Sequence, residues 1–320
     1  MVLAFILLFV GFVILVKGAD FLVGGAASIA KRFNVSNLAI GLTVVAFGTS
    51  TPELLVNIMS SIKGYNDAAF GNVIGSNIFN LLLILGVAGM IYPLMVQRNT
   101  VSFEVPLSLM AAAVLYILVN DQLLFQRDVN ILSRWDGLIL LALFGLFMVY
   151  VVRTMKDGLG SEEGEPVKVY KPWLSIVYVL SGLAMLVGGG SLVVDNAVAI
   201  AREFGLSEKL IGLTILAAGT SLPELATSAV AAYRKNTDIA IGNVVGSCIF
   251  NIFLILGITG IIKPTPFNIA LNFDLYVLGA STILLMIFMF TLNQRKLDRW
   301  EAFMMFIGYI VYTVVLVGLE

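Results

Sequence analysis

The sequence contains no histidine, one cysteine and few charged residues, which make up 12% of its 320 positions. Without histidine the chain cannot carry an HExxH metal site, a Ser-His dyad or a histidine proton relay. Cys248 alone cannot form an internal disulfide or a cysteine zinc cluster. The net charge of −1 offers no basic surface to nucleic acid. We therefore expect neither a nucleic-acid partner nor an enzyme, since no nucleophile has a base within helical reach.

Apolar residues are correspondingly abundant, at 59% of the chain, and the mean hydropathy is +1.00. Uncharged runs long enough to cross about 30 Å of hydrocarbon predict ten membrane helices. These runs cover residues 2–31, 37–62, 69–92, 101–119, 135–153, 173–202, 208–233, 240–262, 272–290 and 300–318. The first run lacks a basic leading segment, so we expect a helix and not a cleaved signal. The predicted fold is an all-α polytopic membrane protein in a lipid bilayer.

One polar linker divides the chain into two halves. Residues 1–153 form the first five-helix repeat, residues 154–172 the short polar linker, and residues 173–320 the second repeat. Twelve basic residues lie in loops that follow odd-numbered helices, and six lie in loops that follow even-numbered ones. Because basic residues gather in cytoplasmic loops, we predict a cytoplasmic linker and extracellular termini. The expected location is the cell membrane.

Two blocks of sequence occur twice with one offset of 171 residues. The block FNVSNLAIGLTVVAFGTSTPELL (33–55) returns as FGLSEKLIGLTILAAGTSLPELA (204–226), and DAAFGNVIGSNIFNLLLILG (67–86) returns as DIAIGNVVGSCIFNIFLILG (238–257). Each half has an odd number of spans, so the second copy must enter the membrane from the opposite face. Such inverted repeats are typical of secondary transporters that bind their substrate near the bilayer midplane.

Each repeat places a glutamate and a proline inside a membrane span. Pro52 and Pro223 remove a backbone donor and interrupt the helix, which leaves carbonyl groups for a cation to satisfy. Glu53 and Glu224 follow directly, and a charge at the bilayer centre costs roughly 2.5–3.5 kcal/mol. An interhelical hydrogen bond from a protonated carboxyl is the structural alternative for this pair. No lysine or arginine in either helix core can neutralise the two glutamates.

Further oxygen atoms surround these glutamates in the predicted helices. Thr49 and Ser50 precede Glu53 by four and three residues, which predicts that both hydroxyls share its helical face. The same spacing relates Thr220 and Ser221 to Glu224. The following helices carry polar stripes at i, i+4 spacing, which are Asn72, Ser76 and Asn80 in one repeat and Asn243, Ser247 and Asn251 in the other. We expect Asn72 and Asn243 only to tie helix ends together.

Hard oxygens at flexible distances favour Ca²⁺ and can also hold Na⁺, whereas Mg²⁺ demands a tighter octahedron. Two carboxylates neutralise one divalent cation, and the same oxygens divided among subsites hold monovalent ions. Competition for shared oxygens is a physical basis for exchange. The serines and threonines have a plainer alternative, since hydroxyls in membrane helices often bond to neighbouring helices or to their own carbonyls.

The paired GTSxPE and GNxxGSxxxN segments resemble the two alpha-repeats of the cation/Ca²⁺ antiporter superfamily, and most closely its prokaryotic sodium/calcium exchangers. The resemblance implies that Glu53 and Glu224 are the central calcium ligands. It implies further that carbonyls near Ala46, Thr49, Ala217 and Thr220, with the hydroxyls of Ser50, Ser76, Ser221 and Ser247, complete the calcium and sodium sites. Asn80 and Asn251 would line the central position.

By the same resemblance the chain imports Na⁺ to export Ca²⁺, and the first and sixth helices slide across the other eight. The expected ligands are the transported ions Ca²⁺ and Na⁺, without a cofactor or an obligatory protein partner. Some family members have an aspartate at the position of Asn251, and in potassium-dependent exchangers an acid there accompanies K⁺ transport. Asn251 therefore favours potassium independence. Proton/calcium antiport is the nearest alternative, and a cation channel is a more distant one.

Overall fold

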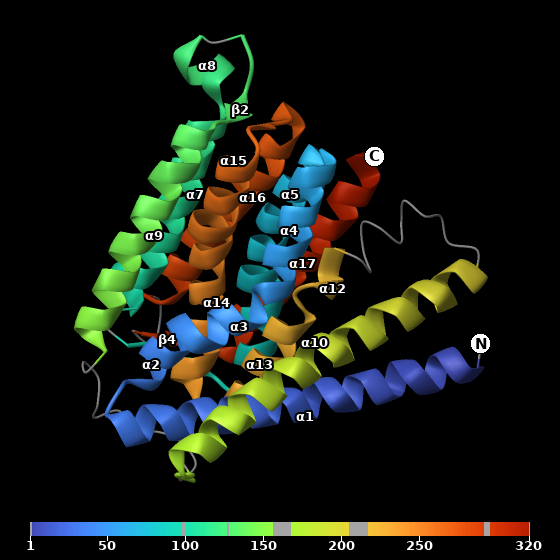
Figure 1. Ribbon diagram of the computed structural model, residues 1–320, viewed down its shortest axis with the longest axis vertical. Coiled ribbons are helices and arrows are strands. Elements are labelled where there is room, and N and C mark those ends of the chain that lie inside the picture. The colour runs from blue at the N-terminus through green and yellow to red at the C-terminus, as the bar shows by residue number, and fades with distance from the viewer. Residues whose placement is uncertain are drawn as a thin grey trace.

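The computed structural model describes residues 2–97, 100–126, 128–155, 168–204, 217–290 and 295–319, and it shows a bundle of membrane helices (Figure 1). Two helices, α1 (Val2–Phe33) and α10 (Pro172–Glu203), lie obliquely across one end of the bundle, while the other long helices run roughly parallel to each other. The linker predicted at 154–172 is described only at its two ends. The remainder of that prediction lies outside the described residues.

Within the described residues, eight helices are long and apolar enough to cross a membrane, and one bent pair gives a ninth span. Helix α1 is the first span of the first repeat, and α10 is the first span of the second. The second span of the first repeat consists of α2 (Asn37–Ile40), η1 (Gly41–Val45) and α3 (Ala46–Thr49), bent into α4 (Thr51–Lys63). Its other spans are α5 (Asn66–Ile78) with η2 (Phe79–Ile84) and α6 (Leu85–Ile91), η3 (Thr100–Glu104) with α7 (Val105–Val119), and α9 (Arg134–Thr154). Those of the second repeat are α14 (Thr237–Ile249), η5 (Phe250–Leu256) and α15 (Gly257–Ile262); η6 (Ile269–Leu271) with α16 (Asn272–Phe288); and α17 (Arg299–Leu319).

The seventh predicted span, residues 208–233, is described only from Ala217 onward. Its described part contains α12 (Ala217–Gly219) and α13 (Leu222–Tyr233), and the rest lies outside the described residues. The other predicted spans agree with the observed helices to within three residues at each end. Length and apolar composition alone determine these boundaries, because only a helix satisfies its backbone within hydrocarbon.

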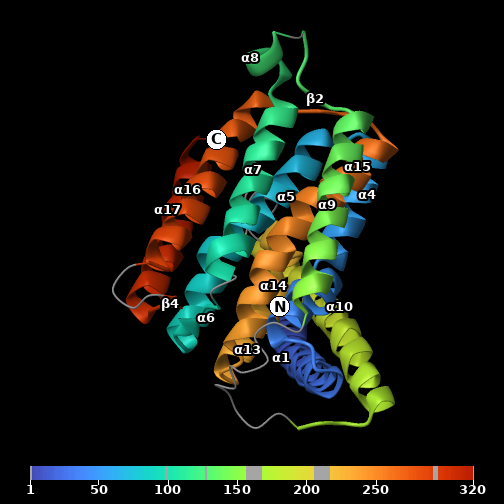
Figure 2. The same ribbon diagram turned by 90° about the vertical axis from the view of Figure 1, so that its left-hand side faces the viewer.

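Two short β-ribbons show the inverted symmetry directly. Strand β1 (Leu94–Met95) pairs with β4 (Lys296–Leu297), and β2 (Ile131–Leu132) pairs with β3 (Thr265–Pro266), both antiparallel. Strand β3 is the repeat equivalent of β1 at the offset of 171 residues, so the two ribbons are counterparts. They lie at opposite ends of the bundle, with β2 beside the short helix α8 (Asp121–Phe125) and β4 at the other end (Figures 1 and 2).

Helices α1 and α10 contact each other closely because glycines line their interface. Gly11 of α1 lies against Val193, and Gly18 lies against Gly182, so the two helices run antiparallel. A Cβ atom added at Gly182 would lie 2.6 Å from the backbone nitrogen of Leu22. Small residues permit such close backbone approach between membrane helices. The pair therefore packs as one unit across the rest of the bundle.

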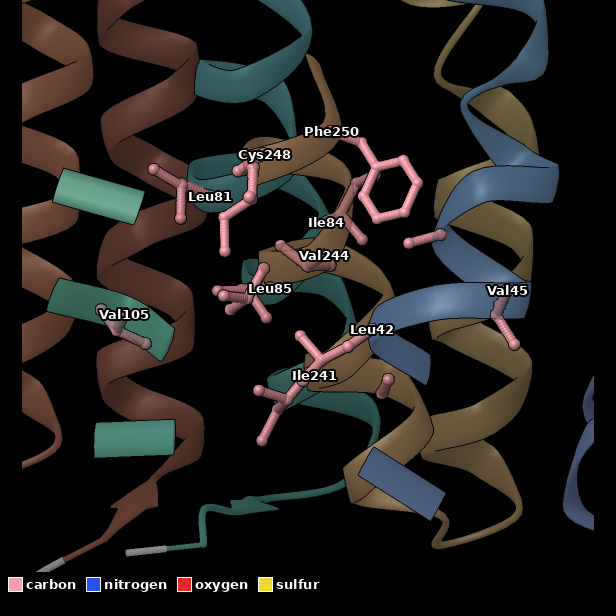
Figure 3. Close-up of a cluster of buried hydrophobic side chains, with 14 of the residues drawn as sticks. Leu42, Val45, Leu81, Ile84, Leu85, Val105, Ile241, Val244, Cys248 and Phe250 are labelled. Carbon is pink, nitrogen blue, oxygen red and sulfur yellow. The ribbon is translucent and has the colours of Figure 1, made fainter. Parts of the chain in front are cut away.

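The core of the bundle forms around α14, in which every residue except Asp238 is buried. Residues of α14 meet η1 of the first repeat and the η2–α6 segment that follows α5 (Figure 3). The side chains drawn there include Leu42, Val45, Leu81, Ile84, Leu85, Val105, Ile241, Val244, Cys248 and Phe250. The two repeats thus share one continuous core, in which the polar residues of both halves are enclosed.

Candidate ion-binding site

Both GTSxPE segments interrupt their helices, as the prolines predict. In the first repeat α3 ends at Thr49 and α4 begins at Thr51, with a bend of 46°. Pro52 occupies the first turn of α4, where a backbone N–H would have no acceptor within the helix, so the proline costs no helical hydrogen bond. In the second repeat α12 ends at Gly219 and α13 begins at Leu222. Each break starts a new helix inside the membrane.

Each glutamate lies in the first turn of the helix that follows a break. Glu53 is in the first turn of α4 and Glu224 in the first turn of α13, and each is only 1% exposed. The N-terminal end of a helix carries partial positive charge, which stabilises a carboxylate there. Two helix N-termini therefore hold a buried pair of carboxyl groups.

The serines of the two motifs contact the glutamates crosswise. Ser50 Oγ donates to Glu224 Oε1 at 3.0 Å, and Ser221 Oγ donates to Glu53 Oε1 at 3.0 Å. Ser50 also lies 3.0 Å from Ser247 Oγ, and Ser221 lies 3.0 Å from Ser76 Oγ. Each serine thus bonds to the glutamate of the other repeat, a contact that the spacing within one motif does not predict. The helix break turns each serine towards the other repeat.

The threonines and the predicted carbonyl ligands lie beside these contacts. Thr49 Oγ1 is 3.1 Å from the Val45 carbonyl, 3.3 Å from the Ala46 carbonyl and 3.0 Å from Asn243 Oδ1. The Ala46 carbonyl also accepts the Ser50 N–H at 2.9 Å. Thr220 Oγ1 is 3.3 Å from Asn72 Oδ1, and Ala217 is the first residue of α12.

Four buried oxygens in this region have no hydrogen-bond donor. They are Oε2 of Glu53, Oε2 of Glu224, Oδ1 of Asn80 and Oδ1 of Asn251, two from each repeat. Asn80 and Asn251 lie in the π-helical turns η2 and η5, a geometry that is frequent at functional sites. An acceptor left unsatisfied in the interior costs about 1–3 kcal/mol. A cation that binds these oxygens would recover that cost.

Asn72 and Asn243 do tie helices together, and they also touch the predicted ligands. Asn72 Nδ2 donates to Asn57 Oδ1 at 2.8 Å, and Asn243 Nδ2 donates to Ser228 Oγ at 2.9 Å. Their Oδ1 atoms face the threonine hydroxyls of the opposite repeat. These asparagines thus help to orient Thr49 and Thr220. The i, i+4 spacing of these asparagines with the serines and asparagines of the site is the sequence feature that could have indicated their contacts with the threonines.

Asn77, which no repeated motif marks, holds Asn251 in place. Asn251 Nδ2 donates to Asn77 Oδ1 at 2.9 Å, and Asn77 Nδ2 donates to the Cys248 carbonyl at 3.3 Å. This bond fixes the amide nitrogen of Asn251, while the Oδ1 atom of the same amide is left without a donor. Cys248 is the repeat equivalent of Asn77, and its thiol contacts Asn80, the counterpart of Asn251. The two repeats therefore place different side chains, an amide and a thiol, beside equivalent asparagines.

The sequence model of the sodium/calcium exchanger protein family matches residues 3–153 and 174–318, nearly the whole of both repeats. The chain belongs to the sodium/calcium exchanger family. This family consists of cation/Ca²⁺ exchangers, so the protein is a transporter and not an enzyme. It is also a multi-pass membrane protein, as the membrane spans indicate.

Proteins from other organisms match the chain over almost their full length. The chain is 39% identical over 320 residues to the putative antiporter CaxA of Alkalimonas amylolytica, covering 97% of this chain and 98% of that protein. It is 32% identical over 344 residues to the sodium/calcium exchanger MaX1 of Methanosarcina acetivorans, covering 98% of each. A solved structure of the sodium-calcium exchanger NCX_Mj superimposes with a TM-score of 0.82 at 32% identity, covering 98% of both chains.

Proposed function

We propose that this exchanger moves Na⁺ and Ca²⁺ in opposite directions by alternating access, with both cations competing for one site between the repeats. The observation that carries this proposal is the set of four buried oxygens without donors, contributed equally by the two repeats. All four are acceptors only, and two belong to carboxylates. Hard, partly anionic oxygens of this kind favour Ca²⁺ and Na⁺.

The proposed ligands divide by charge. Glu53 and Glu224 neutralise one Ca²⁺, and the amide oxygens of Asn80 and Asn251 complete its inner ligands. The hydroxyl and carbonyl oxygens around them supply Na⁺ positions, from Ser50, Ser76, Ser221, Ser247, Thr49, Thr220, Ala46 and Ala217. Because the glutamate oxygens bind both Ca²⁺ and Na⁺, Ca²⁺ must leave before the Na⁺ ions occupy their positions.

Calcium uptake by proteoliposomes tests this function. An outward Na⁺ gradient should drive ⁴⁵Ca²⁺ uptake, and Glu53→Gln or Glu224→Gln should abolish it, since either change removes one of two charges that balance Ca²⁺. Asp128→Asn, in an exposed loop, is the matched control and should transport normally. Retention of the melting temperature would show that the inactive variants are folded. Sodium-driven uptake that survives both glutamine substitutions would refute the proposed site.

Proton/calcium antiport is the competing function, because protons can compete with cations for two buried carboxylates. The same vesicles distinguish the two. Calcium uptake driven by a pH gradient in Na⁺-free medium would favour the proton antiporter, while uptake only with a Na⁺ gradient supports the proposal.

We also propose that the protein lies in the cell membrane with both termini outside. Its only cysteine, Cys248, is buried, so introduced cysteines can be labelled without background. Asp128→Cys lies in the loop after the fourth span and Val169→Cys in the linker, and both positions are exposed. A membrane-impermeant maleimide should label the first variant in intact cells and leave the second unlabelled. The reverse pattern would overturn the orientation.

A further inference from the structure

An apolar groove lies between α7 and α16, which pack side by side, and contains none of the residues of the proposed transport site (Figure 2). Its volume is about 470 Å³, within the roughly 300–1,000 Å³ of sites that bind small molecules. The lining consists of Leu109 from α7 and of Ile283, Met286, Ile287 and Phe290 from α16 and the turn after it. Because α7 belongs to the first repeat and α16 to the second, an occupant of the groove contacts both halves of the protein.

The groove lies within one leaflet of the bilayer. Its α16 side runs from Ile283 to Phe290, which is seven residues or about 10 Å along a helix. Half of the hydrocarbon core measures about 15 Å. At the Phe290 end, the exposed ring of Trp300 lies 5.7 Å from the ring of Phe288. Tryptophan is typical of the headgroup level, so the groove ends at a membrane surface.

A basic segment begins where the groove ends. The Arg295 N–H donates to the Met289 carbonyl at 2.8 Å, which fixes Arg295 beside the last lining residue. Arg295 is exposed, and so is Arg299 at the start of α17. Lys296 lies between them and pairs with Asp298 at 2.8 Å. Cationic side chains at this level attract anionic lipid headgroups. The groove therefore combines an apolar wall with a cationic rim.

We propose that this groove binds one anionic phospholipid, with an acyl chain along α16 and the phosphate beside Arg295. The chain removes exposed apolar side chains such as Ile283 and Phe290 from contact with mobile lipid, and a guanidinium group binds phosphate through paired N–H donors. The bound lipid thus bridges the two repeats on their outer face. Under the proposed orientation this end is cytoplasmic, on the leaflet that carries anionic lipids. The site itself does not depend on that orientation.

A second copy of the chain matches the groove less well. Close association of membrane helices uses small residues at the interface, whereas this groove is lined by leucine, isoleucine, methionine and phenylalanine. A symmetric dimer on this face would also bring the Arg295 side chains of both copies to the same end of the interface, where like charges repel. A flexible acyl chain adapts to bulky side chains, and its phosphate neutralises the arginine.

Native mass spectrometry of the delipidated protein in detergent tests this site. The probes are phosphatidylglycerol, which is anionic, and phosphatidylcholine, which is not, with identical acyl chains. We expect one phosphatidylglycerol to bind severalfold more tightly than phosphatidylcholine. Arg295→Gln should lower the affinity for phosphatidylglycerol about fivefold and leave that for phosphatidylcholine unchanged. Ile283→Trp places a larger side chain in the groove at an exposed position and should weaken binding of both lipids.

Two matched variants control for general effects of charge and bulk. Lys63→Gln removes an exposed basic residue from another loop, and Ile307→Trp adds bulk to an exposed position of α17. Neither should change the affinity for phosphatidylglycerol, and unchanged melting temperatures of the lipid-free variants would show that they are folded. Should Ile283→Trp fail to fold, Arg295→Gln alone decides. Equal binding of the two lipids, or a preference for phosphatidylglycerol that survives Arg295→Gln, would overturn the proposal. A lipid-free dimer that Ile283→Trp dissociates would overturn it too and assign the groove to a second copy.

Discussion

Ser50 Oγ donates to Glu224 Oε1 at 3.0 Å, so a side chain of the first repeat holds the central carboxylate of the second. Ser221 and Glu53 form the reciprocal contact at the same distance. Each carboxylate therefore has one oxygen fixed by the opposite repeat and one oxygen without a donor. The site exists only where the two halves meet, and neither repeat could build it alone.

Removing either serine hydroxyl should weaken cation binding. Ser50→Ala deletes a hydrogen bond to a charged group, which contributes about 1.5–3 kcal/mol. We expect the Na⁺ concentration for half-maximal exchange to rise roughly tenfold, and Ser221→Ala to act similarly because its contacts are equivalent. The measurement is ⁴⁵Ca²⁺ flux as a function of Na⁺ concentration.

Thr51→Ala is the control for this pair. The Thr51 hydroxyl donates to the Phe47 carbonyl of α3, across the helix break, at 2.9 Å, and this bond involves neither glutamate. The variant should exchange normally. Equal losses in the Ser50 and Thr51 variants would show that the helix break, and not the contact with Glu224, accounts for the effect.

The sequence predicted the spans, the inverted repeat and the helix breaks, because these follow from run length, apolar composition and proline position. It did not predict the crosswise serine contacts. Spacing of three and four residues places Ser50 beside Glu53 only if the helix continues, and the 46° bend at Ser50 removes that condition. Which residue of the other repeat then receives the hydroxyl depends on tertiary packing, which local spacing does not encode.

Asn77 should matter for Ca²⁺ affinity although no repeated motif marks it. Asn77→Ala leaves the buried amide of Asn251 without its acceptor, at a cost of about 1–3 kcal/mol. The freed side chain can then rotate, so that its Oδ1 no longer stays in the central position. We expect the apparent Ca²⁺ affinity to fall roughly tenfold, measured as the Ca²⁺ concentration for half-maximal flux.

The repeat equivalent of Asn77 provides the comparison. Cys248 contacts Asn80 as Asn77 contacts Asn251, but a sulfur atom is a weaker hydrogen-bond partner than an amide oxygen. Cys248→Ala should therefore lower Ca²⁺ affinity less than Asn77→Ala. If both variants lost affinity to the same extent, altered packing between α5 and α14 would explain the loss and the positioning role of Asn77 would be wrong.

Exchange should not require K⁺. The family resemblance implies that K⁺ transport accompanies an acid at the position of Asn251, and the Asn251 side chain carries no charge. Flux should remain the same when K⁺ is replaced by choline on both sides of the vesicle. Asn251→Asp adds a charge and loses the donor that bonds to Asn77, so we expect that variant to transport Ca²⁺ poorly with or without K⁺. Stimulation of the unaltered protein by K⁺ would contradict this prediction.

Close contact between α1 and α10 should depend on Gly182 and not on Gly188 of the same helix. A Cβ at Gly182 would lie 2.6 Å from the Leu22 nitrogen and 2.8 Å from the Gly18 carbonyl, and both are backbone atoms that cannot turn aside. Gly182→Ala should therefore force the helices apart and lower the free energy of unfolding by about 1–3 kcal/mol. A Cβ at Gly188 meets no atom within 4 Å, so Gly188→Ala should be neutral or stabilising by up to about 1 kcal/mol. Thermal unfolding of the two variants in the same detergent measures the difference, and equal melting temperatures would mean that the two helices separate without cost.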